Sequence, residues 1–269
     1  MKPQVEPNHY FSMSYDSKER FISYWHQINE IIKLNPKRVL EIGIGNGFVS
    51  KYLKERGINI ITLDIDCRLQ PDVVGSVTNI PFTDKSFDVV ACYEVLEHLP
   101  YENFHTSLCE IFRVSSSYAI LSLPDASRVY RIDVQIPKIG EIKRLFYLPR
   151  RKIPVHNFDG EHYWEIGKFG YPLKKIVEDI QRAGFEVKKT YRVLEFPYHR
   201  FFVLRKLKRS EFTQSSDLWP EMGKYGRKFV EKHYDIRRLN KRLVEIYQNL
   251  IRKENNNDSG RGWGWVSTG

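Results

Sequence analysis

The first part of the chain alternates short apolar runs with amphipathic stretches. Continuous apolar runs of this length are typical of strands buried on both faces, and they predict strands at 38–43, 58–63, 73–75, 87–92 and 118–123. Apolar positions that recur at helical spacing predict helices between these strands, at 47–56 and 101–114. Strands and helices that alternate in this way predict an α/β fold with a mostly parallel sheet.

An amphipathic helix is predicted at 16–34, ahead of the first strand, with Asp16 as its expected N-cap and Pro36 beyond its end. Its apolar stripe is expected to consist of Phe21, Trp25, Ile28 and Ile32. A further helix at 172–183 and strands at 185–192 and 200–205 follow a long interruption of the pattern.

The pattern divides the chain into segments. Residues 1–36 are expected to form an N-terminal helical cap. Residues 125–170 lack a clean period and come after a strand's carboxyl end, where α/β enzymes build substrate lids. Residues 208–253 are predicted to be a C-terminal helical appendage, and residues 254–269 a disordered tail.

Composition narrows the class of protein. Apolar residues make up 41% of 269 residues, as in globular proteins. No stretch approaches the roughly 20 apolar residues that span a bilayer, and the polar start of the chain lacks the core of a signal peptide. The three cysteines show no paired spacing. These features predict a cytoplasmic protein without a transmembrane segment.

The net charge of +10 is concentrated in two regions, 138–152 and 205–253. Such an excess favours an anionic partner, which could be RNA, a phosphorylated small molecule or a membrane surface, although a solvated helix face gives the same pattern. The basic residues of the first region are Lys138, Lys143, Arg144, Arg150, Arg151 and Lys152.

A glycine-rich turn follows the first predicted strand, and an aspartate ends the second. Gly43, Gly45 and Gly47 alternate after Glu41, and Asp64 closes the next apolar run. Glycines allow close approach of the backbone to a ligand, and an aspartate here can accept both hydroxyls of a ribose. The spacing is not the G-x-G-x-x-G of dinucleotide folds. A carboxylate before the turn opposes a diphosphate and suits a positively charged ligand.

These residues resemble the class I S-adenosylmethionine-dependent methyltransferases of the methyltransferase type 11 kind. Four further segments match that pattern in order: Gly75–Phe82, Ser86–Ala91, Glu94–Leu99 and Glu110–Val114. The resemblance implies a Rossmann-like methyltransferase domain at 37–207, with helices on both faces of a mostly parallel sheet and an antiparallel seventh strand. It also implies S-adenosylmethionine as the cofactor. The implied cofactor-binding residues are Glu41, Gly43, Gly45, Gly47, Asp64, Ile65, Ser76, Val77 and Glu94.

Glu94, Glu97 and His98 would share one face of a helix, because their offsets are i, i+3 and i+4. The same Glu-x-x-Glu-His pattern occurs in metal-dependent O-methyltransferases, and the resemblance adds His162 as a further ligand. One interpretation is a Mg²⁺ or Mn²⁺ site built from these four residues. The other is that Glu94 contacts the cofactor, Glu97 complements a helix N-terminus, and His98 or His162 acts alone as general base. The candidate catalytic residues are thus His98, His162 and Glu97.

Three functions remain open for the whole protein. We expect O-methylation of a small-molecule or glycan acceptor, with the basic cluster of the lid holding an anionic part of it. A metal-dependent RNA 2′-O-methyltransferase is the alternative that the positive charge favours, although no RNA-binding domain is recognisable. A nonenzymatic binding module on a methyltransferase fold is the third possibility. The sequence does not reveal the acceptor or the oligomeric state.

Overall fold

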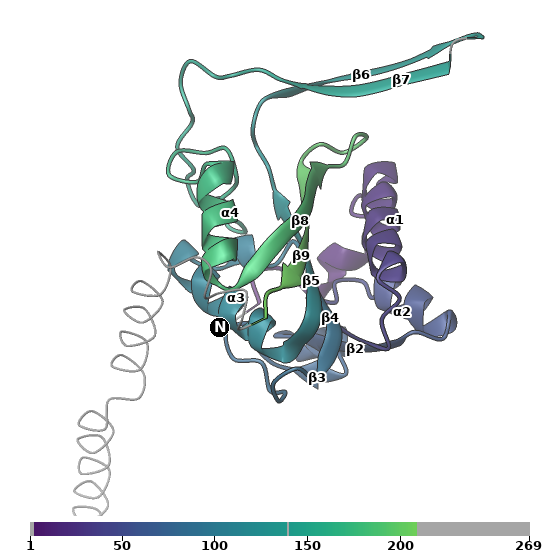
Figure 1. Cartoon of the computed structure of the whole chain (residues 1–269), viewed down its shortest axis with the longest axis vertical. Coiled ribbons are helices and arrows are strands. Elements are labelled where there is room, and N and C mark those ends of the chain that lie inside the picture. Colours follow the sequence, from purple (N-terminus) through teal and green to yellow (C-terminus); the bar gives the residue numbers. More distant parts are fainter. Residues whose placement is uncertain (1–2, 139, 209–269) are drawn as a thin grey trace, which may run out of the picture. The chain divides into compact units, whose positions relative to one another are not determined.

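The computed structural model describes residues 3–138 and 140–208. The predicted C-terminal helices and tail lie outside this part of the chain, except for residue 208. Seven strands form one sheet in the order β3-β2-β1-β4-β5-β9-β8 (Figure 1). Their bounds are β1 (Arg38–Ile42), β2 (Asn59–Asp64), β3 (Val73–Val74), β4 (Phe87–Tyr93), β5 (Ser115–Pro124), β8 (Phe185–Arg192) and β9 (His199–Lys206).

Neighbouring strands from β3 to β5 pair in parallel, and β9 pairs antiparallel with both β5 and β8. The predicted Rossmann-like class I methyltransferase sheet with an antiparallel seventh strand is therefore confirmed. Helices cover both of its faces, as separate apolar clusters show: α1 and α2 pack on one face, and α3 and α4 on the other. The helices are α1 (Lys18–Lys33), α2 (Phe48–Glu55), α3 (Phe104–Val114) and α4 (Leu173–Arg182).

Short 3₁₀ helices complete the core fold. They are η1 (Pro7–Phe11), η2 (Cys67–Leu69), η3 (Leu96–His98) and η4 (Tyr101–Asn103). In the described part of the chain, every helix is too short or too polar to cross a bilayer.

Helix α1 buries a different face from the predicted one. Ser17, not Asp16, is its N-cap, and its hydroxyl accepts from the Arg20 N–H. Of the predicted stripe only Ile28 is buried, whereas Trp25 is 59% exposed. The predicted stripe is wrong because polar side chains of α1 turn toward partners in the sheet: Ser23 bonds to His199, and Glu30 bonds to Lys189. Its buried residues are Ser23, Tyr24, Gln27, Ile28, Glu30 and Ile31.

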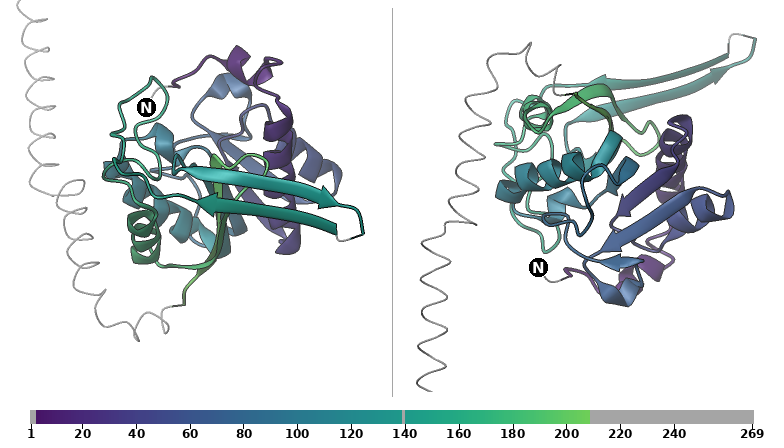
Figure 2. Two further views of the ribbon diagram at one scale, coloured as in Figure 1. Left: turned by 90° about the horizontal axis from the view of Figure 1, so that it is seen from above. Right: turned by 60° about the horizontal axis from the view of Figure 1, so that its bottom comes forward.

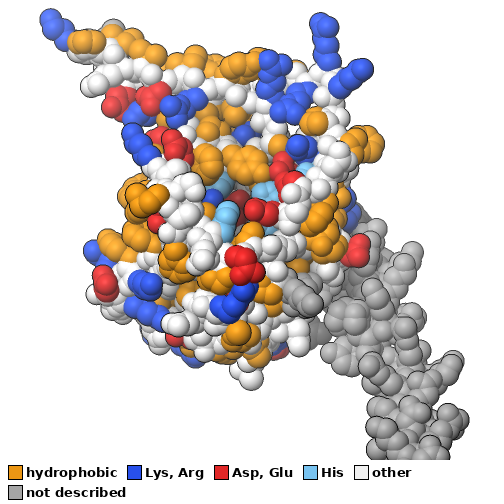
Figure 3. Space-filling model, turned by 180° about the vertical axis from the view of Figure 1, so that it is seen from behind, with side chains coloured by type: hydrophobic (Ala, Val, Ile, Leu, Met, Phe, Trp, Pro, Cys, Tyr) orange, Lys and Arg blue, Asp and Glu red, His pale blue; other side chains and the backbone are white. Residues whose placement is uncertain are grey.

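Residues 125–170 were predicted to be irregular, and this is wrong for part of the segment because it contains two strands. Strands β6 (Val129–Ile136) and β7 (Gly140–Tyr147) form a separate two-stranded antiparallel sheet. This β6–β7 arm extends over the β8–β9 connection (Figure 2), and hydrophobic side chains run along it (Figure 3). Strand β6 alternates Tyr130, Ile132, Val134 and Ile136 with polar residues, and this period of two is a strand signal that the prediction of an irregular lid overlooked.

Candidate functional site

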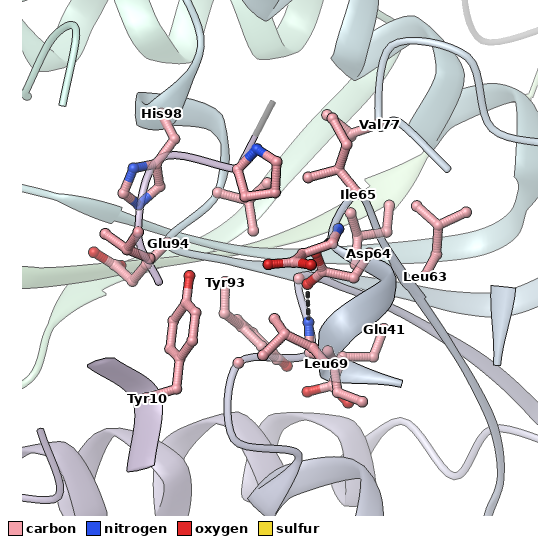
Figure 4. Close-up of a pocket in the computed structure, with 18 of the residues that line it drawn as sticks. Tyr10, Glu41, Leu63, Asp64, Ile65, Leu69, Val77, Tyr93, Glu94 and His98 are labelled. Atoms are coloured by element: carbon pink, nitrogen blue, oxygen red, sulfur yellow. Dashed lines mark hydrogen bonds between the residues drawn. The ribbon is translucent and has the colours of Figure 1, made fainter. Parts of the chain in front are cut away.

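A cavity of about 610 Å³ opens where the carboxyl ends of β1, β2 and β4 meet. The turn after β1 lines it, and Figure 4 shows Glu41, Asp64, Glu94 and His98 around the same cavity. Gly43 has a φ of +82°, and a Cβ atom there would lie 2.3 Å from Cγ2 of Val95. Glycine is required at this position both by the backbone conformation and by the space.

Asp64 joins the ends of β1 and β2. Its Oδ2 accepts from the Ile44 N–H at 2.9 Å, and its Oδ1 accepts from the Asp66 N–H at 2.9 Å. Burial raises the pKa of Asp64. Each carboxylate oxygen can accept more than one hydrogen bond, so both oxygens keep capacity for ligand hydroxyls in the cavity.

Glu41 lies in β1 and also lines the cavity. It is buried, its Oε2 has no hydrogen-bond partner among the described residues, and burial raises the pKa of Glu41 to about 8. A buried carboxyl without a partner is costly when it is ionised. The site would therefore gain from a cationic ligand at this end of the cavity.

Eight of the predicted cofactor-binding residues line the same cavity: Glu41, Gly43, Gly45, Asp64, Ile65, Ser76, Val77 and Glu94. Gly47 does not line it. With a φ of +72°, Gly47 instead turns the chain into α2, as its N-cap.

Residues before β1 form one wall of the cavity, which the sequence pattern did not predict. Tyr10, Tyr15 and Tyr24 line it, and the guanidinium of Arg20 lies 4.2 Å from the ring centre of Tyr15. Arg20 is the one lysine or arginine among the described residues that line this cavity. The segment before α1 has no hydrophobic period that could have signalled this role.

Glu94 follows β4 in the left-handed conformation, with a φ of +50°. The prediction that one helix carries Glu94, Glu97 and His98 is wrong, because the chain makes this turn before the 3₁₀ helix η3 begins at Leu96. A strained residue of this kind is held by its surroundings, and the Glu94 N–H donates to the carbonyl of Ser122. The turn leaves Oε1 of Glu94 buried without a partner in the described structure.

The structure nevertheless brings three of the four proposed metal ligands together. One ligand atom each of Glu97, His98 and His162 lies within 4.8 Å of the others, and Glu94 is not part of this group. Glu97 is fully buried and neither of its carboxylate oxygens has a partner among the described residues. Burial raises the pKa of Glu97 well above its ordinary value, and the neighbouring charge of Glu94 raises it further.

The hydrogen bonds of His98 define its tautomer. Its Nδ1 lies 3.0 Å from the carbonyl oxygen of Glu161 and 2.8 Å from Oε1 of Gln4, and both can only accept. Nδ1 therefore carries the proton, which leaves a lone pair on Nε2. Burial lowers the pKa of His98, which keeps the ring neutral. Because His98 lines the cavity, Nε2 could accept a proton or bind a metal there.

His162 is positioned from the other side by residues of the lid and of the β8–β9 connection. Its Nδ1 lies 3.4 Å from Oε1 of Glu165 and 3.3 Å from the hydroxyl of Tyr198. The Tyr198 hydroxyl also donates to Glu165 at 2.7 Å. The ring of His162 meets that of His98 edge to face, with 5.0 Å between the centres.

Comparisons with known proteins agree with this architecture. Residues 40–123 match the family model described as a methyltransferase domain. A protein of Mycolicibacterium smegmatis named "Probable S-adenosylmethionine-dependent methyltransferase" is 25% identical over 189 residues, 64% of this chain and 63% of that protein. A ubiquinone biosynthesis O-methyltransferase of Hahella chejuensis is 33% identical over 88 residues, 27% of this chain and 37% of that protein. The chain thus spans less than two thirds of the length of these curated relatives.

A solved structure has the same fold. An S-adenosylmethionine-dependent methyltransferase from Clostridium acetobutylicum aligns with a TM-score of 0.51 at 9% identity, covering 76% of this chain and 100% of that chain. The match to the methyltransferase domain covers the strands and turns that build the cavity. The sheet order and this match identify residues 40–123 as part of a class I S-adenosylmethionine-dependent methyltransferase domain.

Proposed function

We propose that the protein transfers the methyl group of S-adenosylmethionine to an oxygen of a small-molecule or glycan acceptor. The residues of the cavity fit this cofactor. The carboxyl of Glu41, whose Oε2 lacks a partner, would face the ammonium group of the methionine moiety. The glycine turn leaves room for the cofactor, and Asp64 would accept from the ribose hydroxyls. The sulfonium supplies an activated methyl group when the cofactor is bound.

The protein's own contribution would be alignment and proton removal. Holding two reactants in line can contribute roughly 7–11 kcal/mol to lowering a barrier. An alcohol acceptor must also lose its proton. The main support for an oxygen acceptor is His98, which lines the cofactor cavity and has a free lone pair on Nε2. A general base needs such a lone pair within reach of the acceptor hydroxyl. The Hahella chejuensis relative, an O-methyltransferase by name, supports the same acceptor atom.

A divalent ion at Glu97, His98 and His162 is a second proposal for the same step. Glu97 favours it, because neither of its carboxylate oxygens has a partner among the described residues and a cation would neutralise this buried group. Carboxylate and imidazole ligands suit Mn²⁺. A bound ion would supply Lewis acidity toward an acceptor hydroxyl, and Glu165 would orient His162 as a ligand.

The lid was expected to hold the acceptor through its basic cluster, but an aromatic residue of the lid lines the cavity instead. Tyr163 lines the cavity. None of the six basic residues of 138–152 does so in the described structure. The proposed acceptor would therefore contact Tyr163 and His98 at the opening of the cavity. That the acceptor is anionic stays a prediction.

Methyl-labelled cofactor and fractionated cell extract test the proposal. The wild-type chain should transfer label to a small-molecule or saccharide fraction. The Asp64→Asn variant should bind S-adenosylhomocysteine at least about tenfold more weakly, because it loses one charged hydrogen bond to the ribose. Asp72→Asn is the control, because Asp72 accepts from Thr62 and Lys54 outside the cavity. Label in RNA, or tight cofactor binding without any transfer, would contradict the proposed acceptor.

A further inference from the structure

The β6–β7 arm carries its apolar residues on the face that points away from the rest of the described structure. The residues of this outward face are Tyr130, Ile132, Val134, Ile142 and Phe146, and they are 42% to 49% exposed. Strand register places them together, since Tyr130 pairs with Phe146 and Val134 with Ile142. Seen from above, no described segment crosses over the arm (Figure 2, left).

The opposite face of the arm is the one that meets the body of the protein. Arg131 donates to the carbonyl of Glu195 at 3.0 Å, and Lys143 lines a second cavity beside Trp25. The guanidinium of Arg192 lies 5.8 Å from the ring centre of Tyr147. Polarity along the arm is thus reversed, with polar side chains inward and apolar side chains outward. Exposed apolar patches of this kind mark interaction surfaces.

The base of the arm is held firmly. The side chain of Arg192 donates to the backbone carbonyls of Asp125 and Ser127. The carboxylate of Asp125 also accepts from Nε of Arg200 at 2.6 Å. All three charged side chains are buried. These bonds anchor the backbone just before β6 begins.

Basic residues surround the outward face and continue beyond it. Arg128, Lys138, Arg144, Arg150, Arg151 and Lys152 are all exposed. Within the described residues none of them forms an ion pair with a carboxylate. In the segment after β7, the consecutive Arg150, Arg151 and Lys152 are flanked by more exposed apolar side chains, namely Leu148, Ile153 and Val155. Figure 3 shows blue and orange side chains interleaved along this end of the molecule.

We propose that the β6–β7 arm docks the protein on a membrane surface that contains anionic lipids. Apolar side chains that insert at the interface and basic side chains that meet anionic headgroups are the two parts of such binding. An RNA partner would use the charges but leave the outward apolar face exposed to water. The arm follows the carboxyl end of β5 in the chain, and this end lies at the same edge of the sheet as the cofactor cavity.

Flotation of the full chain with vesicles tests this inference. Vesicles of phosphatidylcholine and phosphatidylglycerol in equal parts should carry the protein upward, whereas vesicles of phosphatidylcholine alone should carry much less. Val134→Asp should weaken binding on the order of tenfold, because it places a charge in the inserted face. Gln135→Asp is the matched control, with the same new charge on the neighbouring residue and the opposite face. It should weaken binding less than Val134→Asp does.

The basic residues are tested separately. The double variant Arg150→Gln and Arg151→Gln should weaken binding to the anionic vesicles by about fivefold for each charge removed. Retained binding of S-adenosylhomocysteine by every variant would show that the fold is intact. Equal loss with Val134→Asp and Gln135→Asp, or no vesicle binding at all, would overturn the inference. So would a dimer in sedimentation that Val134→Asp dissociates, since the outward face would then be covered by a second copy.

Discussion

The Nε2 atom of His199 lies 3.6 Å from Oε2 of Glu94. The other ring nitrogen of His199 is 2.7 Å from the hydroxyl of Ser23. Helix α1, strand β9 and the turn after β4 are thereby connected inside the protein by three buried or half-buried side chains. Since Glu94 lines the cofactor cavity, residues far from the glycine turn help to position that wall.

A double-mutant cycle measures this connection. His199→Gln and Glu94→Gln should each destabilise the protein, and the double variant should be more stable than the sum predicts. We expect a coupling free energy of about 1–2 kcal/mol, because buried neighbours couple whereas distant sites add. Urea denaturation of the four proteins provides the measurement. His199→Gln paired with Asp72→Asn, which lies outside the site, should be additive, and strict additivity for Glu94 would show that the contact has no energetic weight.

The turn at Gly43 should not tolerate a side chain. Gly43→Ala combines a positive φ with a Cβ atom 2.3 Å from Val95, so it should destabilise the protein by more than about 2 kcal/mol and abolish cofactor binding. Gly57→Ala is the matched control, because Gly57 has a φ of +79° and nothing within 4 Å of a new Cβ. It should cost only about 1–2 kcal/mol and leave binding intact. Thermal unfolding with and without S-adenosylhomocysteine would distinguish the two; equal effects would mean that the clash is relieved elsewhere.

Affinity for S-adenosylmethionine should rise with pH through Glu41. The pKa of Glu41 is raised from 4.5 to about 8, so its carboxyl is neutral at pH 7 in the free protein. An ammonium group in the cavity favours the carboxylate, so binding releases a proton below pH 8. Titration calorimetry should show affinity that increases with pH by at most about tenfold per unit, up to pH 8.

The raised pKa of Glu41 has the opposite effect on the stability of the free protein. The folded state holds more protons than the unfolded state between pH 4.5 and 8, so the contribution of Glu41 to stability falls as pH rises across this range. Glu41→Gln should flatten both profiles. A variant whose affinity keeps the wild-type pH dependence would assign the proton to another group.

Manganese binding tests the cluster of Glu97, His98 and His162 without a methyl acceptor. Calorimetry with Mn²⁺ should show one site, and Glu97→Gln or His162→Ala should weaken it about 10–100-fold. His26→Gln is the control, because His26 bonds to Tyr191 away from the cluster. No heat with the wild-type chain would remove the ion from the proposal and leave His98 as the base.

The glycine turn and Asp64 could be predicted because their spacing after two buried strands is specific. The wall formed by Tyr10 and Gln4 could not, since its residues lie in a polar segment and act through contacts 94 positions apart in the sequence, as between Gln4 and His98. Glu94 was assigned to the site but to the wrong local structure. A left-handed turn at a non-glycine residue leaves no trace in hydrophobic periodicity.

The position of β9 between β5 and β8 constrains how the chain can fold as it is synthesised. Strand β8 leaves the ribosome before β9, yet its place in the sheet is beside β9, at the edge. Strand β8 therefore has no partner in the sheet until residues 199–206 insert next to β5. That insertion also delivers His199 to Glu94. A nascent chain that stops short of this strand would hold the glycine turn and yet lack a finished pocket wall.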